Sequence, residues 1–381
     1  MTSQASDNLP ATFKGLQFSS ATEPPSIVEL PTPTPAAGSV ILRPLYSSIP
    51  SYSKDVFCNG NPRGYNYPLP MVPGTDAICR IAAPAPDTPH LKPGMLVFAS
   101  GVVRPRDNSS ALPSLQGILM GASLESEAIM KGEWRNGCWA EFVKVPAENV
   151  HVLNERILIK KLDYNIEDLG FISTLAVAYG GLSDIGLKPG ETVIVAPATG
   201  NFGSAAVLVA LAMGAGKVIA MGRSQEKLQD VLNGTGGRVA ILPITGDVGT
   251  DTAAVQAHGP IDVYFDISPH SATKSSHIAA SISALRPKGR MCIMGGIQGD
   301  ISFPYHMLMF KRLTIQGTFM YTREQVDELI RLVETGILPI GKRGGVEVTG
   351  KFSLGKWEEA FQNAHEQMGP RKAAYFIPNE E

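Results

Sequence analysis

The hydrophobic positions follow two different rhythms along the chain. From Phe13 to about Val150, short apolar runs are separated by Pro and Gly, as in SVILRPLYSS, AICRIAA, MLVFAS and WAEFVKVP. Runs of this length between turn residues are typical of strands and loops. The pattern predicts an antiparallel, barrel-like β domain. A long irregular segment at 101–137, with a short helix near 123–131, interrupts it and has the character of a binding loop.

After about Ile166 the rhythm changes to alternating helices and buried strands. A helical stretch precedes the apolar run Thr192–Ala196, a Gly-containing turn, a helix rich in Ala, Val and Leu, and a second apolar run, Lys217–Met221. This succession predicts a βαβ unit of a buried parallel sheet. Further apolar runs follow at VAILPI, IDVYFDIS and RMCIMGG, then helical patterns at 323–335 and in SLGKWEEAFQNAHEQM, and a final strand, AAYFIP. We therefore expect an α/β protein.

Length and composition agree with two differently built halves. The chain has 381 residues, and 19 of its 29 prolines precede residue 151. A chain of this length suggests two domains, or one large domain with an insertion. The 33 Lys and Arg residues against 35 Asp and Glu residues leave a net charge of −2. This balance argues against a nucleic-acid partner, whose phosphates require clustered cations.

The expected location is the cytoplasm. The four cysteines are isolated, as is typical of reduced thiols, and the N-terminus lacks the basic and apolar regions of a secretory signal. No apolar run approaches the ~18 residues that a membrane span needs, so no membrane partner is expected.

The turn after the first buried strand has the features of a dinucleotide-binding motif. A glycine at its third position would let the backbone approach a pyrophosphate, and one at its sixth would let the following helix pack against the sheet. Within a βαβ unit this pattern indicates a cofactor site, and a tight turn without ligand is the alternative. The predicted cofactor-binding residues are Thr199, Gly200, Asn201, Phe202 and Gly203, with Ala198 in the first glycine position.

The end of the second strand favours NADP over NAD. An NAD site usually places a carboxylate there for the ribose 2′-hydroxyl, whereas an NADP site supplies Arg for the phosphate. The sequence reads Met221-Gly222-Arg223-Ser224, with Lys227 one turn into the next helix. The planar guanidinium of Arg223 suits a phosphate, because it can donate two hydrogen bonds. The alternative is a solvated helix start.

Together these features resemble the medium-chain dehydrogenase/reductase superfamily. The resemblance includes VPGTD at 72–76, GEWRNGCWAEFVKVP at 132–146 and LKPGETVIV at 187–195. It implies a GroES-like β-rich substrate domain at 1–163, completed by 320–381, and a Rossmann domain with a doubly wound parallel sheet at 164–319. It also implies hydride transfer between NAD(P)H and a carbonyl, alcohol or activated alkene.

The residues at the positions of the family's zinc ligands are not zinc ligands. The resemblance places Tyr52, Thr75 and Ser173 where zinc-dependent members have Cys, His and Cys or Asp. Zinc sites are built from thiolate, imidazole or carboxylate groups, and the cysteines of the structural zinc lobe are also absent from 101–137. No metal is therefore expected, and the chain resembles the zinc-free branch of quinone oxidoreductases and enoyl reductases.

Without zinc, a proton donor must act on the reduced substrate. By resemblance, Tyr52 stands where a side chain faces the nicotinamide. If the segment is extended, Lys54 shares its face and would favour the phenolate. The hypothesis is that Tyr52 is an acid or oxyanion-stabilising donor tuned by Lys54. A tyrosine that lines the cleft or bonds the cofactor ribose is the alternative.

The resemblance also places two backbone segments, at 293–296 and 317–319, against the nicotinamide carboxamide, so Gly295 and Phe319 are further candidates. Lone histidines among apolar residues are more often packing residues, so His151 and His306 are minor candidates, and Asp76 is expected to be architectural.

The leading interpretation is an NADPH-dependent, zinc-independent reductase of an activated C=C bond or a quinone, acting on a small apolar carbonyl-containing substrate, as in specialised metabolism. Alternatives are a zinc-free carbonyl reductase or alcohol dehydrogenase, and a non-catalytic NADP-binding protein. Family members occur both as homodimers through the Rossmann sheet edge and as monomers, and the sequence leaves this choice open.

Overall fold

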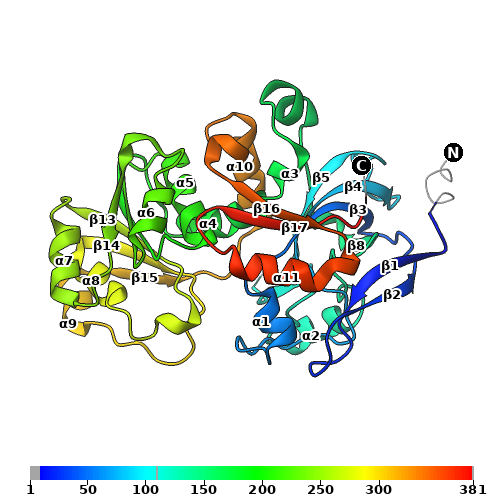
Figure 1. Cartoon of the computed structure of the whole chain (residues 1–381), viewed down its shortest axis with the longest axis horizontal. Coiled ribbons are helices and arrows are strands. Elements are labelled where there is room, and N and C mark those ends of the chain that lie inside the picture. The colour runs from blue at the N-terminus through cyan, green and yellow to red at the C-terminus, as the bar shows by residue number, and fades with distance from the viewer. Residues whose placement is uncertain (1–8, 109, 380–381) are drawn as a thin grey trace. The chain divides into compact units, whose positions relative to one another are not determined.

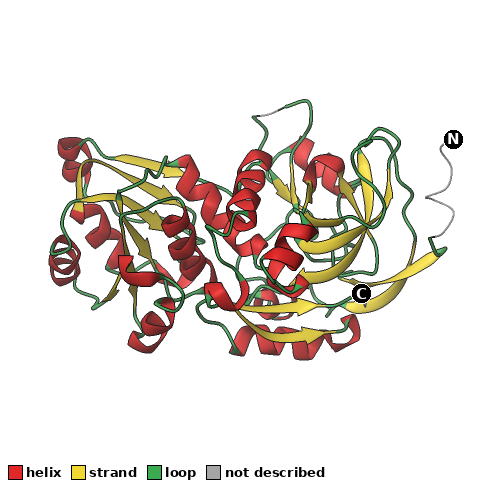
Figure 2. Cartoon of the chain, turned by 90° about the horizontal axis from the view of Figure 1, so that it is seen from above, coloured by secondary structure: helices red, strands yellow, loops and turns green. Residues whose placement is uncertain are grey.

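The computed structural model describes residues 9–108 and 110–379 and divides into two compact units. Of the described residues, unit 1 contains those up to 173, 348–367 and 373–379, and unit 2 contains 174–347 and 368–372. Strands predominate in unit 1, whereas helices and strands alternate through unit 2 (Figures 1 and 2). None of the helices described is long and apolar enough to cross a membrane.

Unit 1 is built on an antiparallel sheet with strand order β16-β17-β3-β4-β5-β9, in which β8 also pairs with β3. β1 pairs with β2, and β6 with β7, in two separate small sheets. The strands of unit 1 are β1 (Thr12–Gln17), β2 (Ser26–Pro31), β3 (Ser39–Ser48), β4 (Ala77–Pro84), β5 (Leu96–Ala99), β6 (Val102–Val103), β7 (Ser114–Leu115), β8 (Val143–Pro146), β9 (Val150–Val152), β16 (Glu347–Phe352) and β17 (Lys372–Phe376). Its helices are α1 (Ser53–Cys58), α2 (Leu124–Lys131), α3 (Ile166–Leu169) and α11 (Trp357–Glu366).

Unit 2 is built on a parallel sheet with strand order β12-β11-β10-β13-β14-β15. Its strands are β10 (Thr192–Ala196), β11 (Lys217–Gly222), β12 (Val239–Pro243), β13 (Ile261–Asp266), β14 (Leu285–Ile293) and β15 (Thr314–Gly317). Its helices are α4 (Ile172–Asp184), α5 (Asn201–Ala212), α6 (Gln225–Val231), α7 (Val248–Gln256), α8 (His277–Ala284), α9 (Tyr305–Lys311) and α10 (Arg323–Glu334). The predicted α/β class is confirmed.

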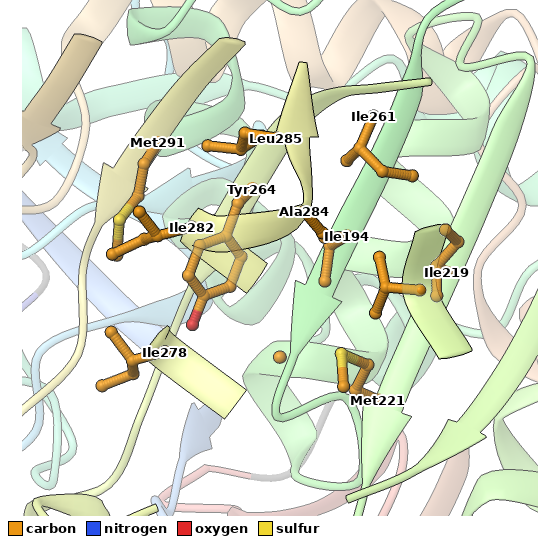
Figure 3. Close-up of a cluster of buried hydrophobic side chains, with 12 residues drawn as sticks. Ile194, Ile219, Met221, Ile261, Tyr264, Ile278, Ile282, Ala284, Leu285 and Met291 are labelled. Carbon is orange, nitrogen blue, oxygen red and sulfur yellow. The ribbon is translucent and has the colours of Figure 1, made fainter. Parts of the chain in front are cut away.

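The core of unit 2 follows from the apolar runs of its strands. Ile194 and Ile219, from neighbouring strands, pack with Ile278 and Ile282 of α8 in one buried cluster (Figure 3). Burial of side chains of this size stabilises the fold by about 1.5–3 kcal/mol each. A change such as Ile194→Asp would place an unpaired charge in this cluster and break it. The packing fixes the carboxyl ends of β10, β11 and β13 at one edge of the sheet.

The unit boundaries differ from those expected at 163/164 and 319/320. The first boundary falls after Ser173, whose hydroxyl lies 3.0 Å from that of Ser48 in β3 of unit 1. The return to unit 1 begins at residue 348, because α10 is held in unit 2 by α4. There Tyr179 donates to Glu328 at 3.0 Å and Gln325 donates to Asp184 at 2.7 Å.

The segment Met368–Lys372 belongs to unit 2, although the residues on both sides of it belong to unit 1. Its anchor is Arg371, whose side chain is 1% exposed and donates to the carbonyl oxygens of Asn233 at 2.7 Å and Asp230 at 2.5 Å. The backbone N–H of Arg371 donates to the Ser204 hydroxyl at 2.9 Å. A buried cation therefore stabilises the carbonyl end of α6, where a positive charge complements the helix dipole.

Candidate cofactor site

The predicted phosphate turn lies between β10 and α5. Gly200 is the N-cap of α5, is exposed, and has no atom within 4 Å of the position that a Cβ would occupy. Gly203 is buried, and a Cβ there would lie 2.1 Å from the carbonyl oxygen of Pro197. Gly203 therefore lets α5 pack against the end of β10, as expected. The open backbone at Gly200 and the helix N-terminus form a site suited to an anion.

Asn201 gives this turn an unsatisfied hydrogen-bonding group. Its Nδ2 lies 3.5 Å from the Thr174 hydroxyl, while its Oδ1 is buried and has no partner among the residues that the structure describes. Buried acceptors in native proteins usually have a partner. A ribose hydroxyl can donate to such an oxygen, so the turn fits a dinucleotide. Thr199 and Phe202 are half-buried on either side of Gly200 and Asn201.

The end of β11 carries the predicted 2′-phosphate group of residues. Gly222 is buried against the methyl of Thr199, and the exposed Arg223 makes no hydrogen bond or ion pair with any residue described. The Ser224 hydroxyl caps α6 by accepting from the N–H of Lys227 at 3.2 Å. The Lys227 ammonium donates to the carbonyl oxygen of Met368 at 3.1 Å, so it is partly engaged. Arg223 is thus the free cation of this set.

The ends of β13 and β14 approach each other at Gly295. A Cβ on Gly295 would lie 2.7 Å from the carbonyl oxygen of Ser268 and 2.9 Å from Oδ2 of Asp266. Only a residue without a side chain fits this approach. Phe319, beyond the end of β15, is 50% exposed and available to a ligand of unit 2.

A buried polar network beneath Gly295 was missed by the sequence analysis. Asp266 Oδ1 accepts from the hydroxyls of Tyr264 at 2.9 Å and Ser268 at 2.6 Å. The Ser268 hydroxyl also lies 2.8 Å from Nε2 of His277, and Nδ1 of His277 lies 2.6 Å from the Ser275 hydroxyl. The sequence feature that could have indicated this network is the carboxylate at the end of IDVYFD, the buried strand β13, which pairs with β10.

Tyr52 and Lys54 do not form the expected pair. The segment is the start of α1 rather than an extended strand, with Tyr52 at its N-cap, so the two side chains do not share a face. Lys54 instead donates to Gln362 of α11 at 2.5 Å. The cation over the Tyr52 ring is Arg63, 3.9 Å from its centroid.

The electrostatic environment of Tyr52 is the reverse of the one expected. Burial of the hydroxyl and the neighbouring Tyr65 raise the pKa of Tyr52 well above its ordinary value, and the positive charge of Arg63 offsets this only in part. Tyr52 is therefore a neutral hydrogen-bond donor, and the expectation that Lys54 promotes its phenolate is wrong.

The residues at the zinc-ligand positions have other partners in unit 1. The Thr75 hydroxyl donates to Asp76 at 2.9 Å, and the Ser173 hydroxyl donates to the carbonyl oxygen of Gly170 at 3.1 Å. Neither these hydroxyls nor Tyr52 is a zinc ligand of the usual kind, so the residues present do not fit a catalytic zinc. In the ranges 9–108 and 110–379, no group of three His, Cys, Asp or Glu residues could hold a metal ion.

The minor candidates are accounted for by packing and loop structure. His151 is buried and its ring lies 6.1 Å from that of Phe98, while the His306 ring stacks on Phe310 at 5.7 Å. Asp76 accepts from the N–H of Gly101 at 3.1 Å as well as from Thr75, which is an architectural arrangement.

A family model described as "Zinc-binding dehydrogenase" matches residues 202–335. The matched range lies outside the three zinc-ligand positions. "Probable D-xylulose reductase A" from Aspergillus clavatus is 24% identical over 235 residues, covering 61% of this chain and 62% of that protein. L-threonine 3-dehydrogenase from Anaeromyxobacter dehalogenans is 22% identical over 344 residues, covering 87% of this chain and 90% of its own length. The matched part of this chain thus spans less than two thirds of the length of the D-xylulose reductase relative.

Solved structures share the fold over nearly the whole chain. AibC has a TM-score of 0.76 at 20% identity, with 97% of each chain covered. The rspB alcohol dehydrogenase of E. coli CFT073, in complex with NADH, has a TM-score of 0.76 at 16% identity, covering 97% of this chain and all of its own. A zinc-binding dehydrogenase of Sinorhizobium meliloti 1021, bound to NADP, has a TM-score of 0.74 at 17% identity, with 97% and 100% covered.

Proposed function

We propose that this chain is a member of the medium-chain dehydrogenase/reductase superfamily and acts as an NADPH-dependent, zinc-independent reductase of a C=C bond conjugated to a carbonyl, or of a quinone. NADPH, when bound, supplies the hydride from its nicotinamide ring. The protein supplies binding, orientation and a hydrogen-bond donor to the substrate oxygen.

The observation that carries the choice of NADPH is the end of β11. There the exposed guanidinium of Arg223 has no partner among the described residues, and no carboxylate takes the strand-end position. Ser224, the N-cap of α6, directly follows Arg223, and Lys227 lies one turn into that helix. A phosphate dianion would gain charge-assisted hydrogen bonds here, whereas a bare ribose hydroxyl would lack its usual carboxylate acceptor.

Zinc independence is supported by the donor atoms of unit 1. Tyr52, Thr75 and Ser173 offer hydroxyl groups in place of thiolate and imidazole ligands. In their place we assign Tyr52 as the neutral donor that stabilises developing charge on the substrate oxygen and then protonates the product. The substrate class we propose is a small apolar molecule that contains a carbonyl group.

A carbonyl reductase or alcohol dehydrogenase is the second candidate. The names of the relatives favour it, since one is a xylulose reductase and another a threonine dehydrogenase. Both reactions interconvert an alcohol and a carbonyl. The two candidates differ in the substrate that accepts hydride, and they share the cofactor site.

The test is NADPH oxidation with matched sets of enones, quinones and saturated ketones. The proposal predicts consumption with enones or quinones, and unchanged rates after dialysis against a zinc chelator. Consumption with ketones alone would establish the second candidate. No consumption with any member, despite NADPH binding, would favour a non-catalytic NADP-binding protein.

The cofactor assignment is tested by Arg223→Ala. Loss of a charge-assisted hydrogen bond should weaken NADPH binding by about tenfold to a hundredfold and leave NADH binding within about twofold. Lys188→Ala is the matched control, because it removes one exposed positive charge just before β10, at the amino end of that strand rather than at the carboxyl ends where the cofactor site lies. Equal effects of Arg223→Ala on both cofactors would contradict the assignment.

A further inference from the structure

The backbone at Gly295 is fixed by the segment that follows β13. The N–H of Met294 donates to the carbonyl oxygen of Asp266 at 3.0 Å, and the N–H of Gly296 donates to that of Ser268 at 2.7 Å. The carboxylate of Asp266 lies directly against Gly295, where a Cβ would be 2.9 Å from its Oδ2. The position of Gly295 therefore depends on how Asp266 and Ser268 are held.

Asp266 is held by a set of donors whose roles can be assigned. Burial and the adjacent carboxylate raise the pKa of Tyr264 well above its ordinary value, so its hydroxyl stays protonated and donates to Asp266. The Ser268 hydroxyl also donates to Asp266, so it must accept from His277, whose Nε2 therefore carries a proton. Nδ1 of His277 forms a second hydrogen bond with the Ser275 hydroxyl at 2.6 Å.

This arrangement is costly if its only purpose is to fill the core. Asp266, Ser268 and His277 are 2%, 1% and 1% exposed. A carboxylate buried to this degree is destabilising unless its hydrogen bonds are complete, and apolar residues of similar volume would pack as well or better. A complete network makes the local backbone rigid and gives it one conformation.

The sheet order identifies the ligand that such rigidity would serve. The phosphate turn follows β10, and the 2′-phosphate group of residues follows β11, on one side of it. A dinucleotide lies across the carboxyl ends of the strands with its two halves on opposite sides of this turn. Its nicotinamide half therefore falls over β13 and β14, where Gly295 and Asp266 lie.

We infer that Asp266, oriented by Ser268 and His277, is a positioning residue that fixes the Gly295 backbone under the nicotinamide half of the cofactor. The inference rests on the proposed function, since it requires a bound nicotinamide dinucleotide. Asp266 acts through Gly295 rather than by touching the reacting atoms. Disruption of the network should weaken binding of the nicotinamide half while leaving the adenosine half unaffected.

The experiment compares two ligands by isothermal titration calorimetry on the full chain. NADPH contacts both halves of the site, whereas adenosine 2′,5′-bisphosphate contains only the adenosine half and the 2′-phosphate. Ser268→Ala should weaken NADPH binding by about tenfold, the loss expected for one hydrogen bond to a charged group, and change bisphosphate binding by less than about twofold. Asp266→Asn, which keeps the shape of the side chain, should have the same selective effect.

Ser276→Ala is the matched control. Ser276 is the N-cap of α8, directly before His277. It is buried and donates to Asp251 at 2.6 Å rather than to Asp266. It should weaken NADPH binding by no more than about twofold. If Ser268→Ala does not fold, Asp266→Asn provides the comparison.

Three other outcomes would contradict the role of the network, the dependence of Gly295 on it, or the proposed function. Equal losses for both ligands in Ser268→Ala and Asp266→Asn would show that the network only supports the fold. Unchanged NADPH affinity in both variants would show that Gly295 does not depend on it. Wild-type protein that binds neither NADPH nor the bisphosphate would overturn the proposed function, and the inference with it.

Discussion

Replacement of Arg371 by Met should loosen α6 before it affects the rest of the protein. Methionine approximates the length of the side chain but cannot donate to the carbonyl oxygens of Asp230 and Asn233. Those oxygens lie at the end of α6 and just beyond it, so the perturbation is local. The left-handed backbone at position 371 (φ 52°) is the same for both residues and cancels in the comparison.

The magnitude follows from the two hydrogen bonds that methionine cannot make. Hydrogen bonds of this kind, from a charged donor, contribute about 3–6 kcal/mol as a pair. Against this, the variant removes a cation that burial already disfavours, since burial lowers the pKa of Arg371 to about 10. It also removes a buried Nε that has no partner among the described residues, and removal of such a group stabilises the folded state by about 1–3 kcal/mol. We expect a net loss of about 2–4 kcal/mol in the free energy of unfolding of this region.

The assay is amide hydrogen exchange of peptides that cover α6, measured by mass spectrometry without cofactor. A loss of about 2–4 kcal/mol corresponds to about 30-fold or greater acceleration of exchange where opening of this region controls it. Trp134, Trp139 and Trp357 all lie in unit 1, so tryptophan fluorescence in urea reports on that unit separately. Lys274→Met, which removes an exposed cation of unit 2, is the control. Exchange of α6 within twofold of wild type in Arg371→Met would refute the reasoning.

Three further predictions concern other parts of the molecule. Tyr52→Phe should lower kcat by about 100-fold or more with an unchanged KM for NADPH, because phenylalanine cannot donate a proton; full turnover would exclude the acid role. Asp251→Asn should destabilise the protein at pH 7 and much less at pH 3. Burial alone would raise the pKa of Asp251, but hydrogen bonds from Ser276 and Thr245 outweigh it and lower that pKa. Its contribution is therefore present above the unfolded pKa of about 3.9 and disappears as pH falls through the lower folded value, which urea titrations at both pH values would detect. If the chain is a dimer through the β15 edge, Phe310→Glu should yield monomers in light scattering, because Phe310 is 75% exposed on α9, the helix that directly precedes β15, whereas Leu124→Glu on α2 should not.

The features that were predictable from the sequence are those encoded by neighbouring residues. The apolar run at 192–196, the glycines of the following turn and the helix after it lie within about twenty residues, so the pattern locates the phosphate turn directly. The absence of a carboxylate before Arg223 is equally local. These signals need no knowledge of distant contacts, because strand period, turn chemistry and helix capping act over a few residues.

The features that were missed depend on distant contacts. Asp266 and His277 are separated by eleven positions and follow no motif, and the pairing of Asp266 with Ile293 in the sheet brings Gly295 close to them. The Tyr52–Lys54 pair was mispredicted because α1 begins without a side-chain cap, so no local signal marked a helix there. The compact unit extends past the expected boundary near residue 320 because Tyr179 and Glu328, 149 positions apart, bind α10 to unit 2.

The separate assignment of Met368–Lys372 has a consequence for dissecting the chain. A gene fragment that encodes residues 174–347 would appear to be a complete nucleotide-binding module, yet it would lack the guanidinium that caps the carbonyl end of α6 and the carbonyl that receives the Lys227 ammonium. The same holds for chimaeras made by exchanging the central segment with that of a relative. Such a recombinant needs the loop between α11 and β17 from the same parent as α6, so the smallest transferable module is discontinuous in sequence.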